Sequence, residues 1–228
     1  MKILIAMLCL QFCSAAFAGT IVGTVRAEPK SGVEKETSGG EYSQLKYRHL
    51  ETVDYSAMHD FVVYIDDLNV TNLPATNVME VATMKVAQKS AIFSPHVLPI
   101  VAGTTVEWPN YDDIYHNVFS MSDAKSFDLG LYKGNPTNKW VTFNHVGRVD
   151  VFCSIHANMH CIVLVLPNPY FASTDASGHY AITNVPPGKY KLKAWHERLP
   201  ADTKKIVVPT NGDVRADFTL TIKNLPKY

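Results

Sequence analysis

The feature that most constrains the fold is a short turn between two strand-like runs. Residues 149–152 alternate in character, and residues 162–166 are continuously apolar. These patterns predict a β-strand on each side of a tight turn. Within the turn, Cys153, His156 and Met159 recur at every third position. We therefore expect a thiol, an imidazole and a thioether to meet at one end of a sheet.

These side chains suit a transition metal. Two histidines and a cysteine in a trigonal set, with a weak axial methionine, form a blue-copper electron-transfer centre. The second histidine is expected from residues 110–120, which contain His116. The sequence therefore predicts one type 1 copper site, and its predicted ligands are His116, Cys153, His156 and Met159.

Several runs within residues 88–166 resemble the cupredoxin family. They are Phe-Ser-Pro at 93–95, Gly-Thr at 103–104, Val-Glu-Trp-Pro-Asn at 106–110, His-Asn-Val-Phe at 116–119, and the ligand turn at 153–159. The short ligand turn is most similar to that of amicyanin. The resemblance implies a Greek-key β-sandwich in which Asn117 braces the ligand turn by hydrogen bonding, with Ser154 contributing similarly.

The character of the sequence changes after residue 166. The later motifs are Gly-x-Tyr at 178–180, Val-Pro-Pro-Gly at 185–188 and Tyr-x-Leu-x-Ala at 190–194. Over residues 170–222 this pattern resembles the small prealbumin-like sandwich known as the carboxypeptidase regulatory-like module. In that family the module is usually structural or a binding scaffold, and no catalytic residues carry over.

The predicted fold is therefore all-β, because short strands alternate with turn signals and no strong helical period is present. We expect a cupredoxin-like Greek-key sandwich over residues 19–167 and a small prealbumin-like sandwich over residues 168–228. The polar residues 28–60 are predicted to form a long insertion in the first sandwich, with a short helix near residues 42–50.

Residues 1–18 have the features of a secretory signal peptide. A positively charged start and an apolar run lead to an Ala-x-Ala site, and cleavage is expected between Ala18 and Gly19. The apolar run is too short to span a bilayer comfortably, so the chain is not expected to be transmembrane. Lipid attachment at Cys13 is the weaker alternative, because small residues do not precede it. The predicted location is the periplasm.

The charge balance narrows the class of partner. The chain has 21 basic and 21 acidic residues and no basic stripe, so nucleic acid is not expected as a partner. The expected partners are periplasmic redox proteins, either cytochromes or dehydrogenase-like proteins. The sequence contains no H-E-x-x-H motif and no nucleophile elbow, so we do not expect an enzyme.

Other readings remain open at this stage. Cysteines of exported proteins are often paired, so a disulfide between Cys153 and Cys161 would suit a metal-free structural or binding module. The positions of His116 and Met159 favour a metal instead, and Cys161 is then predicted to be a buried free thiol. Zinc is the competing metal, although it rarely uses methionine. Copper buffering or delivery without redox turnover is an alternative to electron transfer.

The remaining histidines carry weaker signals. His160 lies four residues after His156 and could compete for metal, but it begins the next strand and is not predicted to be a ligand. The histidines predicted to be structural are His96, His145, His179 and His196.

Overall fold

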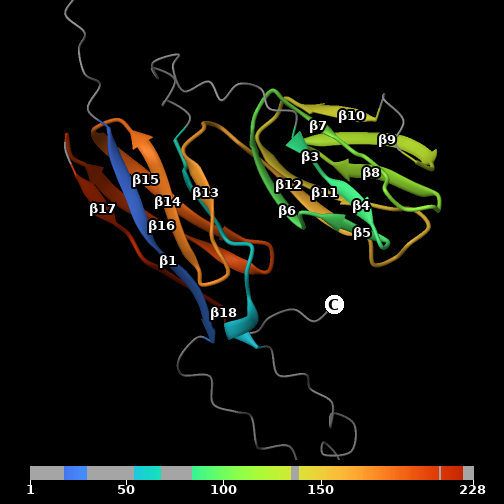
Figure 1. The fold of residues 1–228 in the computed structure, drawn as a ribbon. Coiled ribbons are helices and arrows are strands. Elements are labelled where there is room, and N and C mark those ends of the chain that lie inside the picture. Colours follow the sequence, from blue (N-terminus) through green and yellow to red (C-terminus); the bar gives the residue numbers. More distant parts are fainter. Residues whose placement is uncertain (1–17, 30–53, 68–83, 135–138, 211, 223–228) are drawn as a thin grey trace, which may run out of the picture.

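The computed structural model describes residues 18–29, 54–67, 84–134, 139–210 and 212–222. Over these residues the regular structure is β-strand, apart from the short 3₁₀ helix η1 (Tyr55–Ala57). The strands form two β-sandwiches that lie side by side (Figure 1). The predicted all-β architecture is therefore confirmed.

One sandwich, here called the terminal sandwich, combines strands from both ends of the described chain. Its outer sheet contains, in spatial order, β14 (His179–Val185), β1 (Gly19–Pro29) and β17 (Asp213–Arg215), with β18 (Phe218–Ile222) also paired to β1. Its inner sheet contains β13 (Phe171–Ser173), β2 (Val62–Ile65), β15 (Gly188–His196) and β16 (Leu199–Val208). Alternate residues of β1, including Ile21 and Val25, pack in the core between these sheets.

The pairing of β1 and β2 corrects the predicted module boundary. From the sequence, residues 19–167 are predicted to form one sandwich and residues 168–228 the other. In the structure, β1 pairs with β14, β17 and β18, and β2 pairs with β13 and β15. The physical reason is shared burial, because Val63 and Leu192 lie in one core. The second sandwich is therefore inserted between β2 and β13 of the terminal sandwich.

The inserted sandwich contains β3 to β12. One sheet contains, in spatial order, β6 (Val97–Val101), β12 (His160–Leu166), β11 (Gly147–Phe152), β8 (His116–Ser122) and β9 (Lys125–Tyr132). The remaining strands are β10 (Trp140–Phe143), β7 (Thr104–Glu107) and β3 (Met84–Lys85) in a second sheet, and the hairpin of β4 (Ala87–Lys89) and β5 (Ile92–Ser94). Phe93, Trp108 and Phe143 are fully buried in the core of this sandwich.

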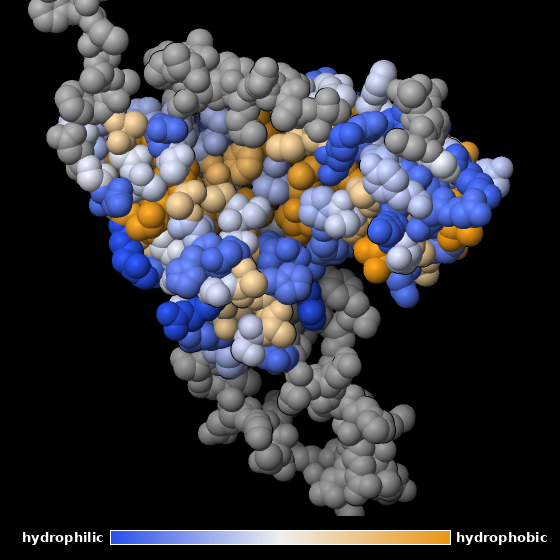
Figure 2. Space-filling model, in the orientation of Figure 1, coloured by the Kyte–Doolittle hydropathy of each residue, from blue (hydrophilic) through white to orange (hydrophobic). Residues whose placement is uncertain are grey.

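A third hydrophobic layer joins the two sandwiches. The odd-numbered residues 161–165 of β12 belong to the core of the inserted sandwich, and the even-numbered residues 162–166 pack with Val62 and Tyr64 of β2. A strand that is buried on both faces needs a continuous apolar sequence, which explains the apolar run in β12. Figure 2 shows hydrophobic surface between the two sandwiches.

Some sequence predictions fall outside the described residues. These are the signal peptide, apart from Ala18, and the short helix near residues 42–50. Of the predicted insertion at 28–60, residues 28 and 29 extend β1, and η1 follows Asp54, whose side chain accepts a hydrogen bond from the amide of Ser56. In the part of the chain that the structure describes, no helix is long and apolar enough to cross a membrane.

The substitution Gly23→Ala tests the placement of β1 in the terminal sandwich. A Cβ atom at Gly23 would lie 2.0 Å from the carbonyl oxygen of Ala216, which precedes β18. Because a backbone oxygen moves only with its strand, we expect the free energy of unfolding to fall by more than about 3 kcal/mol. Urea unfolding followed by circular dichroism measures this change.

Gly103→Ala is the matched control, since it adds the same methyl group in the inserted sandwich. No atom lies within 4 Å of a Cβ at Gly103, and its φ of +93° leaves backbone strain as the cost. That strain amounts to about 1–2 kcal/mol. A Gly23→Ala protein as stable as the Gly103→Ala protein would contradict the close approach of β1 to Ala216.

Candidate metal centre

The strand register of the inserted sandwich brings the two ligand segments together. Phe152, at the end of β11, pairs antiparallel with Phe119 of β8. The residues after Phe152 therefore run alongside the first residues of β8, where His116 begins the strand. Cys153 directly follows β11, and His156 lies in the turn between β11 and β12. Two segments separated along the chain thus meet at one edge of the sheet.

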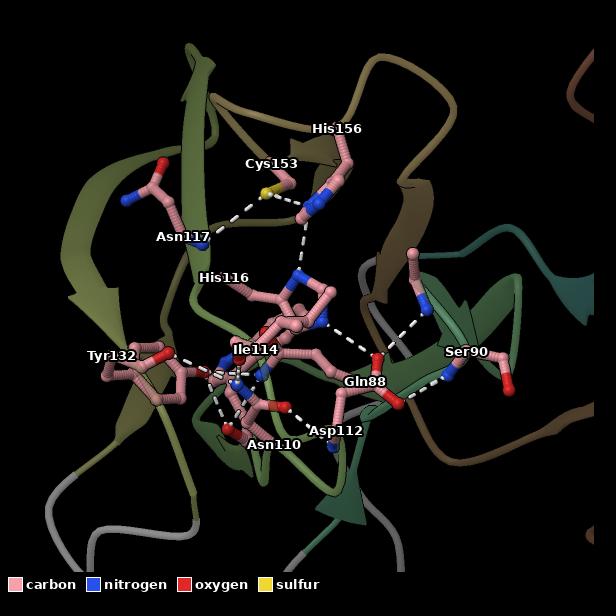
Figure 3. Close-up of polar contacts among 12 residues, drawn as sticks. Gln88, Ser90, Asn110, Asp112, Ile114, His116, Asn117, Tyr132, Cys153 and His156 are labelled. Carbon is pink, nitrogen blue, oxygen red and sulfur yellow. Dashed lines mark hydrogen bonds and ion pairs between the residues drawn. The ribbon is translucent and has the colours of Figure 1, made fainter.

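Three donor atoms converge at this edge (Figure 3). The Nδ1 atoms of His116 and His156 are 3.0 Å apart, and Nδ1 of His156 is 3.6 Å from Sγ of Cys153. One donor atom from each of these three residues lies within 4.8 Å of the others. Tetrahedral bonds to a zinc-sized ion would hold two nitrogens about 3.3 Å apart and a nitrogen and a sulfur about 3.6 Å apart. The observed spacing therefore fits a bound transition metal.

Met159 lies at the base of the same turn. Its side chain is buried in the hydrophobic cluster that also contains Cys153. Its amide donates to the carbonyl of His156 at 3.0 Å, and its carbonyl accepts from the amide of Cys153 at 3.2 Å. These two hydrogen bonds close the turn through the backbone, so its shape is set by the chain itself.

The site lies just beneath the surface. His116 is fully buried and Cys153 is buried, whereas His156 is partly exposed. The turn residues Ser154 and Ile155, which come between the ligands, are exposed. His156 is therefore the member of the three-residue group that approaches solvent.

Asn117 braces the site through its backbone. Its backbone amide donates to Sγ of Cys153 at 3.4 Å, while its side-chain amide donates to Asp128 at 2.7 Å. Asp128 lies on β9, so the side chain ties β8 to its neighbour and not to the ligand turn. Asn117 therefore makes the hydrogen bond to the ligand turn that the resemblance implies, but it does so through its backbone amide, which leaves its side chain for β9.

Asp112 was not predicted to have a role in the site, yet its carboxylate contacts the ring of His116 directly. Its Oδ2 atom lies 2.8 Å from Nε2 of His116. The same carboxylate accepts hydrogen bonds from the amides of Ser90 and Ala91, at 2.6 and 2.9 Å. The Ala91 amide is the largest cause that lowers the pKa of Asp112, with His116 contributing as well. The only sequence signal for this role is the position of Asp112 in the polar loop before His116.

The two amides come from a strained hairpin turn. Ser90 and Ala91, between β4 and β5, have φ angles of +57° and +55°. A two-residue turn of this kind requires positive φ at both positions, and glycine or asparagine usually supplies it. Hydrogen bonds to the Asp112 carboxylate offset part of that cost.

A buried amide holds the loop that carries Asp112. The side chain of Asn110 donates to the carbonyls of Ile114 and Tyr132, at 3.0 and 3.1 Å. Its oxygen accepts from the amide of Asp112 at 2.9 Å. Asn110 therefore cross-links the loop to β9 and fixes the position of the carboxylate next to His116.

Cys153 and Cys161, the two cysteines of the described residues, are free and buried. Cys161 pairs with Val151 across β11 and β12 and lies in the core of the inserted sandwich. Burial raises the pKa of its thiol. The structure thus shows Cys161 as the predicted buried free thiol, without a disulfide to Cys153.

The five further histidines considered in the sequence divide into two groups. His145 and His179 are exposed, and His196 is buried against Phe61. His96 and His160 instead lie together with Glu197 in a second cluster of metal-binding side chains. His96 was predicted to be structural, and His160 was not predicted to be a ligand. Glu197 reaches both from the terminal sandwich and gives them surroundings that the sequence did not indicate.

Comparison with protein families identifies one region of the chain. Residues 163–221 match the model of the carboxypeptidase regulatory-like domain. The match leaves out β1 and β2, although both pair with strands inside the matched range. A comparison with curated proteins found no match.

Comparison with solved structures identifies proteins similar to part of the chain. A Cu-containing nitrite reductase from Thermus scotoductus SA-01 is 27% identical, with a TM-score of 0.35, over 37% of this chain and 22% of that protein. A purple cupredoxin from Nitrosopumilus maritimus is 24% identical, with a TM-score of 0.31, over 36% of this chain and 99% of that one. Amicyanin from Paracoccus versutus is 22% identical, with a TM-score of 0.34, over 46% of this chain and 97% of that protein.

The function must be inferred from this chain's own residues, since the TM-scores are low and each match covers less than half of the chain. Both resemblances noted in the sequence nevertheless recur. The chain contains a region similar to the carboxypeptidase regulatory-like domain, and it is similar over part of its length to solved cupredoxins.

Proposed function

We propose that this chain is an exported type 1 copper protein that carries single electrons between periplasmic redox proteins. The observation that carries the proposal is the convergence of His116, Cys153 and His156 on one point. Thiolate sulfur suits Cu(I) and imidazole nitrogen suits Cu(II), so bound copper would supply a one-electron couple in this donor set. We propose Met159 as the weak axial ligand, because its side chain is buried in the cluster that contains Cys153.

Asp112 supports this role by selecting the form of His116. A carboxylate only accepts hydrogen bonds, so Nε2 of His116 carries the proton that points to Asp112. In the neutral ring Nδ1 then carries a lone pair, and this atom faces Nδ1 of His156 at 3.0 Å. Carboxylates commonly orient metal-binding histidines in this way. Asp112 thus orients the ring of His116 so that Nδ1 is the nitrogen that could bind a metal.

Rigid ligands suit electron transfer, because the protein then rearranges little when the charge of the centre changes. The backbone hydrogen bonds between Cys153 and Met159 hold one side of the site. The strand that follows the turn, β12, is packed on both faces. The same rigidity favours an electron carrier over a copper-delivery protein, which would have to release its ion.

His156 offers a route for electrons to the surface. It is the partly exposed member of the donor set, and its neighbours Ile155 and Ala157 are exposed and uncharged. Weak electron-transfer contacts are small, so a few apolar side chains can provide most of the contact area. The balanced net charge predicts little long-range steering of the partner. We propose a cytochrome or a dehydrogenase-like protein as that partner.

Export to the periplasm is part of the proposal. It is supported by the sequence of residues 1–18, with its charged start, apolar run and Ala-x-Ala site. An exported copper protein can meet soluble redox partners outside the cytoplasm.

Copper reconstitution tests the proposed centre. The copper(II) protein is expected to be strongly coloured by thiolate-to-copper charge transfer, and Cys153→Ala is expected to lose that band. Cys161→Ala is the matched control, because this second buried thiol lies outside the donor set. A colourless copper(II) protein would contradict the proposal. Loss of copper in each cycle of a voltammogram would favour copper delivery over electron transfer.

Removal of the Asp112 charge tests how His116 is held. In Asp112→Asn, an amide NH₂ can face Nε2–H of His116, which disfavours the metal-binding form of the ring. We expect copper affinity to fall about 10- to 100-fold, as measured by competition with a chelator. Asp113→Asn is the control, since Asp113 is 97% exposed and pairs with Lys133. Equal affinities in the two variants would show that Asp112 does not orient the ligand.

A charge at Ile155 tests the electron route. Ile155 is 51% exposed beside His156, and Val207, on β16, is 61% exposed. Ile155→Lys is expected to slow electron self-exchange several-fold, because two like-charged patches must then meet. Val207→Lys is expected to leave the rate unchanged. Nuclear magnetic resonance line widths of mixed copper(I) and copper(II) protein measure the rate, and absorption spectra check that both sites are intact. Equal rates in the two variants would place the electron route elsewhere.

A further inference from the structure

A second group of metal-binding side chains lies where the two sandwiches meet. His96 precedes β6, His160 is the first residue of β12, and Glu197 lies in the turn between β15 and β16. One donor atom from each of the three lies within 4.8 Å of the others. Figure 1 shows β6 and β12 on the side of the inserted sandwich that faces the terminal sandwich. The group therefore takes two donors from one sandwich and one from the other.

The contacts within the group are close and partly open to solvent. Nε2 of His96 lies 3.1 Å from Oε2 of Glu197, and the rings of His96 and His160 are 5.5 Å apart between centroids. The side chains of His96, His160 and Glu197 are 36%, 26% and 23% exposed. An ion from solvent can therefore reach side chains that the fold already brings close together.

His160 is held in a manner typical of a metal ligand. Its Nε2 atom lies 3.0 Å from Oδ1 of Asp150, and its ring stacks on Phe152 with a centroid distance of 4.8 Å. A carboxylate on one ring nitrogen leaves the other nitrogen available for a cation. A simple ion pair between His96 and Glu197 would not need a second imidazole oriented beside it.

The charges around the group favour a cation. Glu197 and Asp150 bring two carboxylates, and Arg148 contributes one positive charge through its ion pair with Asp150 at 2.7 Å. Arg148 also donates to the backbone carbonyl of Glu197 at 3.1 Å, which ties the turn carrying Glu197 to β11. The carboxylates thus outnumber the guanidinium, and the arginine helps to position Glu197.

We infer that His96, His160 and Glu197 form a second metal site, which binds Zn²⁺ and clips the two sandwiches together. Two histidines and one glutamate with an open fourth position are a common zinc donor set. Donors of a tetrahedral zinc ion lie about 3.3 Å apart, so side-chain rotation must close the present spread of the group. The inference stands on these contacts alone and does not rest on the proposed copper function.

Cobalt distinguishes this site from the first one, because only the first contains sulfur. Co²⁺ titrated into the reduced, full-length chain is expected to bind in two steps. One step shows thiolate-to-cobalt charge transfer from Cys153, and the other shows only the weaker bands of nitrogen and oxygen ligands. A titration with a single step, which shows thiolate-to-cobalt charge transfer, would overturn the inference of a second site. Absence of charge transfer, with the weaker bands retained, would count against the copper proposal but support the second site.

Zinc stoichiometry provides the mutational test, by elemental analysis after desalting. We expect two zinc ions per chain in the unmodified protein and one in both Glu197→Gln and His96→Ala. In the two variants, a weak chelator is expected to remove any zinc ion bound at the second site. His179→Ala is the matched control, since His179 pairs with Asp175 on the surface, and it is expected to keep two. Near-ultraviolet circular dichroism checks the fold, and Glu197→Gln keeps the shape of the side chain. Two retained zinc ions in folded Glu197→Gln and His96→Ala proteins would overturn the inference.

Discussion

The structure depends on the burial of β12 on both of its faces. One face completes the core of the inserted sandwich, and the other forms the layer against β2 of the terminal sandwich. A slip of one residue would exchange the two faces and misplace every side chain of the strand. The position of β12 therefore fixes the turn that precedes it, and with it Cys153, His156 and Met159. The same strand begins with His160, which joins the second cluster.

A single carboxylate connects two otherwise separate features of the first site. Asp112 accepts from the amides of a strained hairpin turn and from the ring of His116. The local strain at Ser90 and Ala91 and the orientation of a buried histidine thus depend on one group. These contacts lie within the chain itself, so the fold contributes to the arrangement of the donor set, as the proposed electron-transfer role requires.

Much of this protein could be predicted from the sequence because the signals are local. The alternating and apolar runs identify strands, since side-chain direction alternates along a strand. Cys153, His156 and Met159 lie in one turn, so their spacing alone indicates a metal-binding chemistry. His116 could be added through the resemblance of its surrounding motif to the cupredoxins. The turn motifs after residue 170 likewise indicate the sandwich that is here called the terminal sandwich.

Only the tertiary structure decided which distant segments meet. Periodicity shows which face of β1 or β2 is buried but not what covers it, so both strands were assigned to the wrong sandwich. Asp112 in a polar loop and Glu197 in a turn have no local mark of their roles. Glu197 meets His96 and His160 only because two cores pack against each other across β12. The sequence by itself determined the strands and the chemistry of one turn, whereas the partners of the strands and the second cluster follow from long-range burial, which no short segment encodes.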